Sequence, residues 1–276
     1  MTQVRRMTSL LLLLVLGTGA PVVVAQEGSG DGPVVLVTGS NRGIGFEFVR
    51  QYAELGWNVI ATARTPDRAT DLQSLAGEYP NVRVERLDVT DVGQIQALAR
   101  KYDGWSIDVL LNNAGVLGSA SGQAMDGLDS DEFHRVMAVN AFGPLKVTQA
   151  FLDHVARSDQ KKVVTITSGS GSLGLAAPGG GAYQAGFVYY RASKAAVNMA
   201  MLALHAHASE RDVLVGLYTP PFTESDMAQE VRDALGRDMA AQPVDEVVRA
   251  LVARIGELDT ATSGVFMTYE GNPVPW

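Results

Sequence analysis

The stretch Val34–Gly45, with the sequence VVLVTGSNRGIG, decides the fold of this chain. Its first four residues form a short apolar run, rich in valine, that predicts a buried strand. Three glycines follow, and a helical pattern begins at Gly45. In a strand, glycine turn and helix, the glycines let the backbone approach a pyrophosphate and the helix N-terminus offers amide donors. The stretch therefore predicts a dinucleotide site. Its spacing, Thr-Gly-x-x-x-Gly-x-Gly, differs from the general dinucleotide fingerprint Gly-x-Gly-x-x-Gly. The alternative is a tight glycine turn that binds no ligand.

Strand-like and helix-like segments alternate along the rest of the chain. The expected strands are 34–37, 58–61, 82–87, 109–111, 162–167, 213–218 and 264–267. The expected helices are 45–55, 70–76, 92–101, 130–155, 190–209 and 243–255. This alternation predicts an α/β fold with one doubly wound parallel sheet of about seven strands and helices on both faces. In such sheets the site lies beyond the carboxyl ends of the strands, where the strand order reverses.

Composition and charge exclude several classes of protein. The chain has 276 residues, of which 46% are hydrophobic and 19% charged, and this excludes a disordered or fibrous protein. The net charge of −8 argues against nucleic acid or an anionic membrane as a partner. Cysteine is absent, which excludes disulfides, a thiol nucleophile and a thiolate metal site. No histidine metal site is expected, because His205 and His207 point to different helix faces and His134 and His154 are expected at the surface.

The N-terminus resembles a secretory signal. Arg5-Arg6 is followed by the apolar run Leu10–Leu16, which glycine and proline soon interrupt, and small residues precede a cleavage point after Ala25. We therefore expect a signal peptide over 1–25, a polar linker over 26–33, and export to the periplasm or the medium. The interrupted run is too short for a spanning helix, so we expect no stable membrane insertion after cleavage. The alternatives are an uncleaved membrane anchor and a cytoplasmic protein.

The pentapeptide Tyr190–Lys194, with the sequence YRASK, places a phenol and an ammonium four residues apart. At this spacing Tyr190 and Lys194 share one face of a helix. A nearby ammonium favours the phenolate and lowers the tyrosine pKa from its usual value of about 10. The pair therefore predicts a proton donor for a carbonyl, or an acceptor for an alcohol proton. The alternative is a solvated lysine beside a half-buried tyrosine.

Four motifs in this order resemble the short-chain dehydrogenase/reductase superfamily over residues 34–276: 38–45, 112–115, the serines near 168, and 190–194. Within it, Thr38–Tyr52 and the ending Tyr269–Trp276 are similar to the C-factor-like and sniffer-like carbonyl reductases. The resemblance implies a single Rossmann-like domain. It also implies hydride transfer between NADP(H) and a small-molecule carbonyl or alcohol.

The resemblance further implies four catalytic residues. Ser168 holds the substrate carbonyl, Tyr190 donates the proton, Lys194 lowers the tyrosine pKa and binds ribose, and Asn140 anchors a water in the proton relay. Ser170 and Ser172 compete for the serine role. A plain polar contact between helices is the alternative for Asn140.

The predicted cofactor contacts follow from the glycine turn and from the resemblance. The acid that NAD-preferring folds place after the second strand is replaced by Ala63, whereas Arg42 and Arg64 suit a 2′-phosphate, which favours NADP(H) over NAD(H). The alternative is two surface arginines. The full set of predicted cofactor-binding residues is Gly39, Asn41, Arg42, Gly43, Ile44, Gly45, Arg64, Asp88, Val89, Asn113, Ala114, Gly115, Tyr190, Lys194, Pro220 and Ser225.

One departure from the family pattern follows the sixth expected strand. Relatives carry Pro-Gly there, whereas this chain has Pro220-Pro221, and Pro221 fixes φ and removes a backbone donor. Ser225 still matches the hydroxyl residue that meets the nicotinamide amide. The glycine-rich segment 169–186 is expected to border the substrate site as a mobile loop. Pro221 favours the rival hypothesis of an NADP-binding regulatory or signalling protein with little turnover, and the sequence leaves homo-oligomerisation open.

Overall fold

The computed structural model describes residues 32–177 and 186–276. The predicted signal peptide 1–25 lies outside the described residues. So do most of the predicted linker 26–33 and the central part of the predicted glycine-rich loop.

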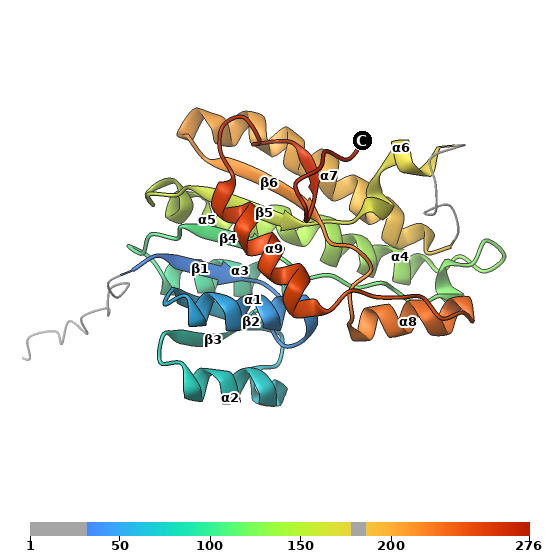
Figure 1. Cartoon of the computed structure of the whole chain (residues 1–276), viewed down its shortest axis with the longest axis horizontal. Helices are drawn as coiled ribbons and strands as arrows, with labels where there is room; N and C mark the ends of the chain where they lie inside the picture. Colours follow the sequence, from blue (N-terminus) through green and yellow to red (C-terminus); the bar gives the residue numbers. More distant parts are fainter. Residues whose placement is uncertain (1–31, 178–185) are drawn as a thin grey trace, which may run out of the picture.

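The described chain contains one seven-stranded parallel sheet with the strand order β3-β2-β1-β4-β5-β6-β7 (Figure 1). The strands are β1 (Val34–Val37), β2 (Asn58–Ala63), β3 (Val82–Arg86), β4 (Val109–Asn112), β5 (Lys162–Ile166), β6 (Leu214–Thr219) and β7 (Phe266–Thr268). Each expected strand is present: β1 has the expected bounds, and the ends of the other strands shift by at most two residues. The order reverses between β1 and β4, which pair in register through Leu36 and Leu110. This reversal creates the switch point at which ligands bind in doubly wound sheets.

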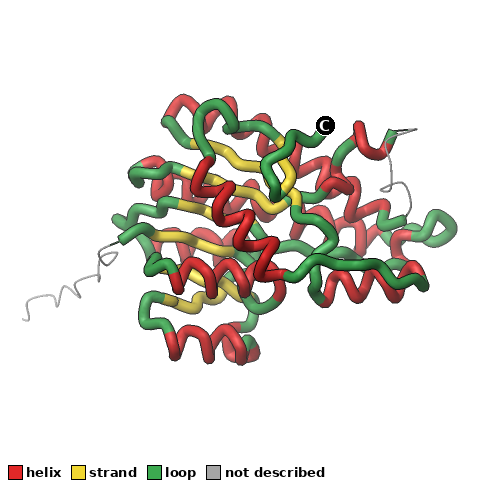
Figure 2. Tube along the Cα trace, viewed as in Figure 1, coloured by secondary structure: helices red, strands yellow, loops and turns green. Residues whose placement is uncertain are grey.

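Helices cover both faces of the sheet (Figures 1 and 2). The α-helices are α1 (Gly43–Glu54), α2 (Thr70–Glu78), α3 (Val92–Lys101), α4 (Ser130–Met137), α5 (Gly143–Ala156), α6 (Leu173–Ala176), α7 (Val188–Ala208), α8 (Asp226–Leu235) and α9 (Val244–Glu257). The α/β fold with a doubly wound sheet is confirmed. Helices α6 and α8 were not among the expected helices.

Alternate residues of the central strands pack into two separate hydrophobic cores, one on each face of the sheet. Leu36 and Leu110 pack with α3, α5 and α7, whereas Val35, Val37 and Leu111 pack with α1, α2 and α9. All four residues of β1 are buried. A parallel strand that is covered on both sides must be apolar on both sides, which explains the unbroken VVLV run before the glycine turn.

The expected single helix over 130–155 is wrong in its middle. Helix α4 ends at Met137, a π-helical turn spans Ala138–Phe142, and α5 begins at Gly143. Pro144 has no N–H and cannot donate to the carbonyl of Asn140 four residues earlier, so regular α-helical bonding fails at this point. The turn carries Asn140, which is buried at 1% exposure. The interruption therefore sits at a predicted catalytic residue.

The surface position expected for His154 is also wrong. His154 lies on α5 at 6% exposure, and its Nε2 is 3.1 Å from the carbonyl oxygen of Ala99. Burial lowers the pKa of the imidazole below its usual value. His154 is therefore a buried packing residue between α5 and α3.

Candidate active site

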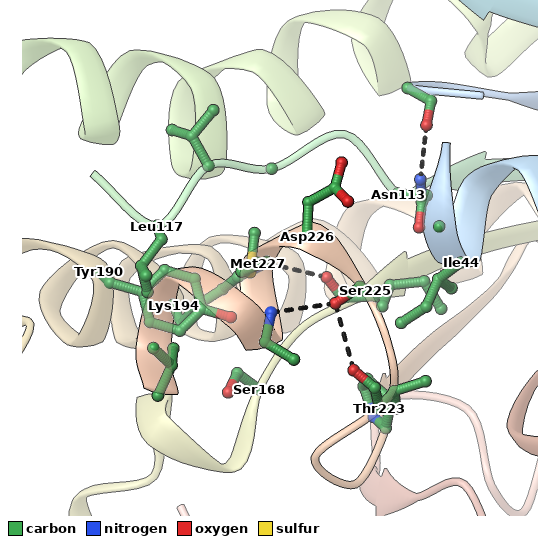
Figure 3. A pocket seen from close by; sticks show the side chains of 18 of the residues that line it. Ile44, Asn113, Leu117, Ser168, Tyr190, Lys194, Thr223, Ser225, Asp226 and Met227 are labelled. Carbon is green, nitrogen blue, oxygen red and sulfur yellow. Dashed lines mark hydrogen bonds between the residues drawn. The ribbon is translucent and has the colours of Figure 1, made fainter. Parts of the chain in front are cut away.

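A cavity of about 760 Å³ lies where the strand carboxyl ends meet the following loops. Its lining includes all sixteen predicted cofactor-binding residues, together with Ser168. Tyr190, Lys194 and Ser168 gather at one end of the pocket, and Ile44 and Asn113 lie at the other (Figure 3). Asn140 is the predicted site residue that does not line it. Segments that are far apart in the sequence thus form one elongated site.

The glycine turn is packed too closely for side chains. Gly39 has φ +69°, and a Cβ there would lie 2.8 Å from the Cα of Ala114; a Cβ at Gly45 would lie 2.2 Å from the carbonyl oxygen of Gly39. The Asn113 amide holds the turn by donating to the carbonyls of Thr38 and Gly39 at 3.0 and 3.1 Å. The Asn113 side chain therefore has a structural role in the turn, and the turn leaves backbone exposed toward the cavity, as a pyrophosphate requires.

Thr38 is a polar centre of this turn that sequence analysis did not assign. Its Oγ1 accepts hydrogen bonds from the backbone N–H groups of Asn113 and Ala114 at 3.0 and 3.1 Å. The hydroxyl joins the ends of β1 and β4 at the switch point. A β-branched hydroxyl residue directly after a buried strand is the sequence signal for this role.

Ser168 lies two residues beyond the end of β5, and Tyr190 lies in the first turn of α7. The two side chains share a hydrogen bond. Ser172 is occupied elsewhere, because its hydroxyl donates to the carbonyl of Pro275. Of the three candidate serines, Ser168 is the one whose hydroxyl bonds to Tyr190, and the geometry therefore favours it for the carbonyl-binding role.

Lys194 is buried one turn beyond Tyr190. It is 5% exposed, its Nζ donates to the carbonyl oxygen of Ile166 at 3.0 Å, and the same Nζ lies 5.7 Å from the centroid of the Tyr190 ring. Burial lowers the Lys194 pKa to about 8. Burial also raises the Tyr190 pKa, and its hydrogen bond with Ser168 acts in the opposite direction. In this structure desolvation is the largest effect on the Tyr190 pKa, and it opposes the lowering expected from the ammonium.

The Asn140 side chain lies behind Gly115 and braces α7, the helix that carries Tyr190 and Lys194. Its Oδ1 accepts from the N–H of Val116 at 2.8 Å, and its Nδ2 donates to the Val116 carbonyl at 2.8 Å and to Ser193 Oγ at 2.9 Å. Ser193 Oγ in turn donates to the carbonyl of Tyr190 at 2.7 Å. A Cβ on Gly115 would lie 3.5 Å from Asn140 Oδ1 and 3.7 Å from Lys194 Nζ, so these two groups flank the same glycine. The amide thus ties the strand β4 loop to α7.

The two arginines expected at a 2′-phosphate line the same cavity. Arg64 is exposed, and Arg42 Nη1 lies 2.6 Å from Asp226 Oδ2, with both side chains 64% exposed. The ion pair links the glycine turn to the start of α8 and was not predicted. Pairs with this exposure contribute little to stability, so Arg42 remains available to a phosphate.

The segment after β6 forms an ordered turn despite Pro221. The carbonyl of Pro221 accepts a hydrogen bond from Thr223 Oγ1 at 2.8 Å, and the carbonyl of Phe222 accepts one from the N–H of Gln242 at 2.8 Å. Ser225 Oγ accepts from Ala228 N–H at 3.2 Å and caps α8. These hydrogen bonds therefore order the segment from Pro220 to Ser225, whose two end residues both line the cavity.

The last residues of the chain brace the segment that follows Ser168. The N–H of Gly174 donates to the carbonyl of Trp276 at 2.6 Å, and the rings of Trp276 and Phe266 lie 5.6 Å apart between centroids. A Cβ on Gly174 would lie 2.9 Å from Pro275 Cβ. These contacts fix α6 against Pro275 and Trp276, and the Trp276 ring packs on Phe266 of β7.

Within residues 32–177 and 186–276, no cluster of three or more His, Cys, Asp or Glu could hold a metal ion. Within the same residues, no helix combines the length and apolar character needed to cross a bilayer.

Comparison with known proteins agrees with this geometry. A model of the short chain dehydrogenase family matches residues 33–236. The C-signal protein of Myxococcus xanthus is 35% identical over 182 residues, which cover 66% of this chain and 100% of C-signal. The NADPH-bound carbonyl reductase from chicken fatty liver is 30% identical with a TM-score of 0.77, covering 89% of this chain and 99% of that one. Carbonyl reductase Sniffer of D. melanogaster shares the fold, with a TM-score of 0.74 at 21% identity and coverage of 89% and 99%. The resemblance predicted from the motifs is confirmed.

Proposed function

This chain belongs to the short-chain dehydrogenase family, and from that premise we propose that it is an NADP(H)-dependent reductase of carbonyl compounds, or dehydrogenase of alcohols. The observation that carries the proposal is the placement of Ser168, Tyr190 and Lys194 in the cavity whose opposite end is the glycine turn. Hydride chemistry belongs to the nicotinamide, and the protein orients the reactants and moves the proton.

The residues present fit a phosphorylated dinucleotide. The turn at Gly39 and Gly45 has no room for a Cβ, which matches a backbone that must approach a pyrophosphate. Position 63 is alanine rather than an acid, so no carboxylate at that place repels a 2′-phosphate. Arg42 and Arg64 would hold the phosphate through charge-assisted hydrogen bonds.

The chain's own groups account for the proton transfer. The Ser168 hydroxyl polarises the substrate carbonyl, and the Tyr190 hydroxyl beside it gives its proton to the carbonyl oxygen. A raised pKa keeps Tyr190 protonated at neutral pH, which suits a general acid in the reducing direction. In its charged form, Lys194 stabilises the phenolate that remains.

The wall beside Tyr190 favours a substrate with an apolar body. Apolar residues that line the cavity include Leu117, Phe187, Pro221, Phe222, Met227, Val231, Leu235 and Met239, and Figure 3 shows Leu117 and Met227 near Tyr190. We propose medium-sized aldehydes or ketones with apolar substituents as the substrate class.

A second candidate is an NADP-binding regulatory protein of the same fold, which Pro221 favours because it changes the turn beside the nicotinamide. The deciding experiment incubates the purified chain with NADPH and a panel of aldehydes and ketones, and follows NADPH oxidation by its absorbance. Turnover above that of Tyr190→Phe supports the enzyme. Tight NADPH binding without turnover on the whole panel supports the regulatory protein.

A further inference from the structure

Helix α7, which carries Tyr190 and Lys194, begins without a cap of its own. Residue Phe187 precedes it in the left-handed region, at φ 51° and ψ 51°, and makes no side-chain bond to the first turn. The first N–H groups of a helix have no partner within the helix, and leaving them unpaired in a buried place is costly. The start of α7 therefore needs an acceptor from elsewhere.

Gln123 supplies that acceptor from a segment more than sixty residues away. Its Oε1 accepts from the N–H of Tyr189 at 2.9 Å and from the N–H of Tyr190 at 3.0 Å. The side chain is buried at 2% exposure. One amide oxygen thus fixes the backbone of the residue proposed to donate the proton.

The other end of the same amide fixes the cavity wall. Gln123 Nε2 donates to the carbonyls of Leu117 and Ser119 at 3.0 and 3.2 Å, and Leu117 lines the cavity. The loop leaves room for this amide at Gly118, where a Cβ would lie 2.8 Å from Nε2. Both donors and the acceptor of Gln123 are used, and they connect Leu117 with Tyr190.

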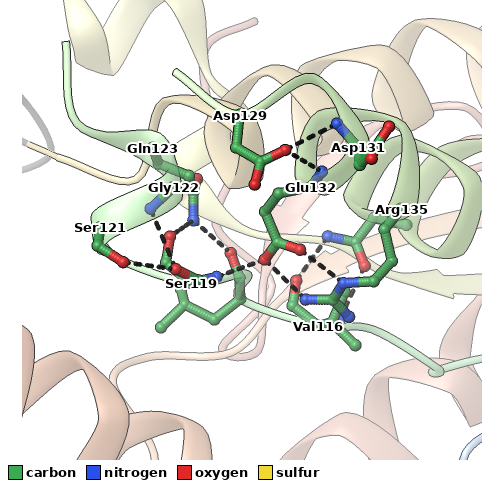
Figure 4. Close-up of polar contacts among 11 residues, drawn as sticks. Val116, Ser119, Ser121, Gly122, Gln123, Asp129, Asp131, Glu132 and Arg135 are labelled. Atoms are coloured by element: carbon green, nitrogen blue, oxygen red, sulfur yellow. Dashed lines mark hydrogen bonds and ion pairs between the residues drawn. The ribbon is translucent and has the colours of Figure 1, made fainter. Parts of the chain in front are cut away.

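The loop around Gln123 is held in turn by α4 (Figure 4). Glu132 accepts from the N–H of Ser119 and pairs with Arg135 at 2.7 Å. The Arg135 hydrogen bond lowers the Glu132 pKa to about 2, so this carboxylate stays charged at neutral pH. Gln123 therefore extends from an anchored loop and not from a free one.

We propose that Gln123 is a positioning residue of the reaction, which caps α7 and sets the distance between Tyr190 and the wall at Leu117. The proposal rests on the proposed reductase activity for its kinetic part only. Gln123 does not line the cavity, so it acts through Tyr190 and not on the substrate. Small displacements of a catalytic group reduce rates steeply, by about 100-fold for 1 Å.

The test compares Gln123→Met with Gln51→Met in the full chain. Methionine keeps the length of the side chain and makes none of these hydrogen bonds. Gln51 is a matched control, because it is 8% exposed and its Nε2 bridges Glu47 and the carbonyl of Asp245, at 2.6 and 2.9 Å. Both variants lose buried amide bonds, but only one of them loses bonds to α7.

We expect Gln123→Met to lower kcat, calculated per NADPH-binding site, by about 10- to 100-fold. The Kd for NADPH should stay within about twofold of the wild-type value. Gln51→Met should keep kcat within about twofold. Amide hydrogen exchange at Tyr189 and Tyr190 should become at least about tenfold faster in Gln123→Met and stay unchanged in Gln51→Met. The exchange result does not depend on turnover, so it tests the cap even if the chain reduces no carbonyl.

Gln123→Glu provides the second variant. Its carboxylate still accepts from the two N–H groups of α7 but donates nothing to Leu117 and Ser119. We expect slow exchange at both tyrosine amides and a kcat between those of the wild type and Gln123→Met. Unchanged exchange in Gln123→Met, unchanged kcat, or an equal loss of kcat in both Gln123 variants would overturn the proposal.

Discussion

Replacing Lys194 with methionine should remove from the folded protein the free-energy cost of a charge that is buried at neutral pH. Burial lowers the Lys194 pKa from 10.5 to about 8. One pKa unit corresponds to about 1.4 kcal/mol, so the charged ammonium costs the folded state about 3 kcal/mol relative to the unfolded chain. Because the folded pKa is the lower one, this cost is fully present below pH 8 and disappears as the pH rises through 10.5.

The measurable quantity is the pH dependence of the free energy of unfolding. Between pH 7 and pH 9.5 the cost of the Lys194 charge should fall by about 2 kcal/mol in the wild type, and this change is absent in Lys194→Met. The methionine variant also leaves the Ile166 carbonyl without its donor, a loss of about 1–3 kcal/mol that does not depend on pH. Urea titrations of both proteins at the two pH values give the difference. A wild-type-minus-variant difference that is constant over this range would refute a buried lysine with a pKa near 8.

Three further outcomes test the site, its cofactor and the proposed export. Tyr190→Phe should lower carbonyl reduction by about 100- to 10,000-fold with NADPH affinity nearly unchanged, and turnover within a factor of two of the wild type would contradict the proton-donor role. Wild-type protein should bind NADPH more tightly than NADH, by about 1.5–3 kcal/mol for each charge-assisted contact of Arg42 and Arg64. The double change Arg64→Ala and Ala63→Asp should reverse this preference, and equal affinities for both cofactors in the unmodified chain would remove the argument. If the proposed signal is cleaved, intact-mass measurement of protein from its native host should find Gln26 as the first residue, whereas a retained Met1 in the soluble cytoplasm would exclude export.

The sequence predicted the sheet better than it predicted the helices around the site. Buried parallel strands must be apolar on both faces, so runs such as Val34–Val37 are visible without any knowledge of their neighbours. The π-helical turn at Asn140 was missed because an amphipathic pattern continues through it, although Pro144 marked the place where α-helical bonding fails.

Long-range polar contacts were beyond sequence analysis for a different reason. The motifs located Ser168, Tyr190 and Lys194 because their spacing and context are local. Gln123 and Asp226 act on partners about 66 and 184 residues away, and nothing in the residues beside them indicates those partners. His154 was misplaced because its burial depends on packing between α3 and α5.

The contact between the chain's last residues and the segment after Ser168 has a consequence for the order of assembly. The cofactor end of the cavity draws its glycine turn and the Asn113 loop from the first 115 residues, whereas the reacting end is braced by Pro275 and Trp276. Contacts between residues so distant in sequence close late, because a long loop must first be ordered. During synthesis from the N-terminus, the glycine turn and the Asn113 loop would be available before the serine segment gains its brace. If the proposed reductase activity is correct, activity should therefore depend on the contacts of Pro275 and Trp276, which close after the cofactor end of the cavity has formed.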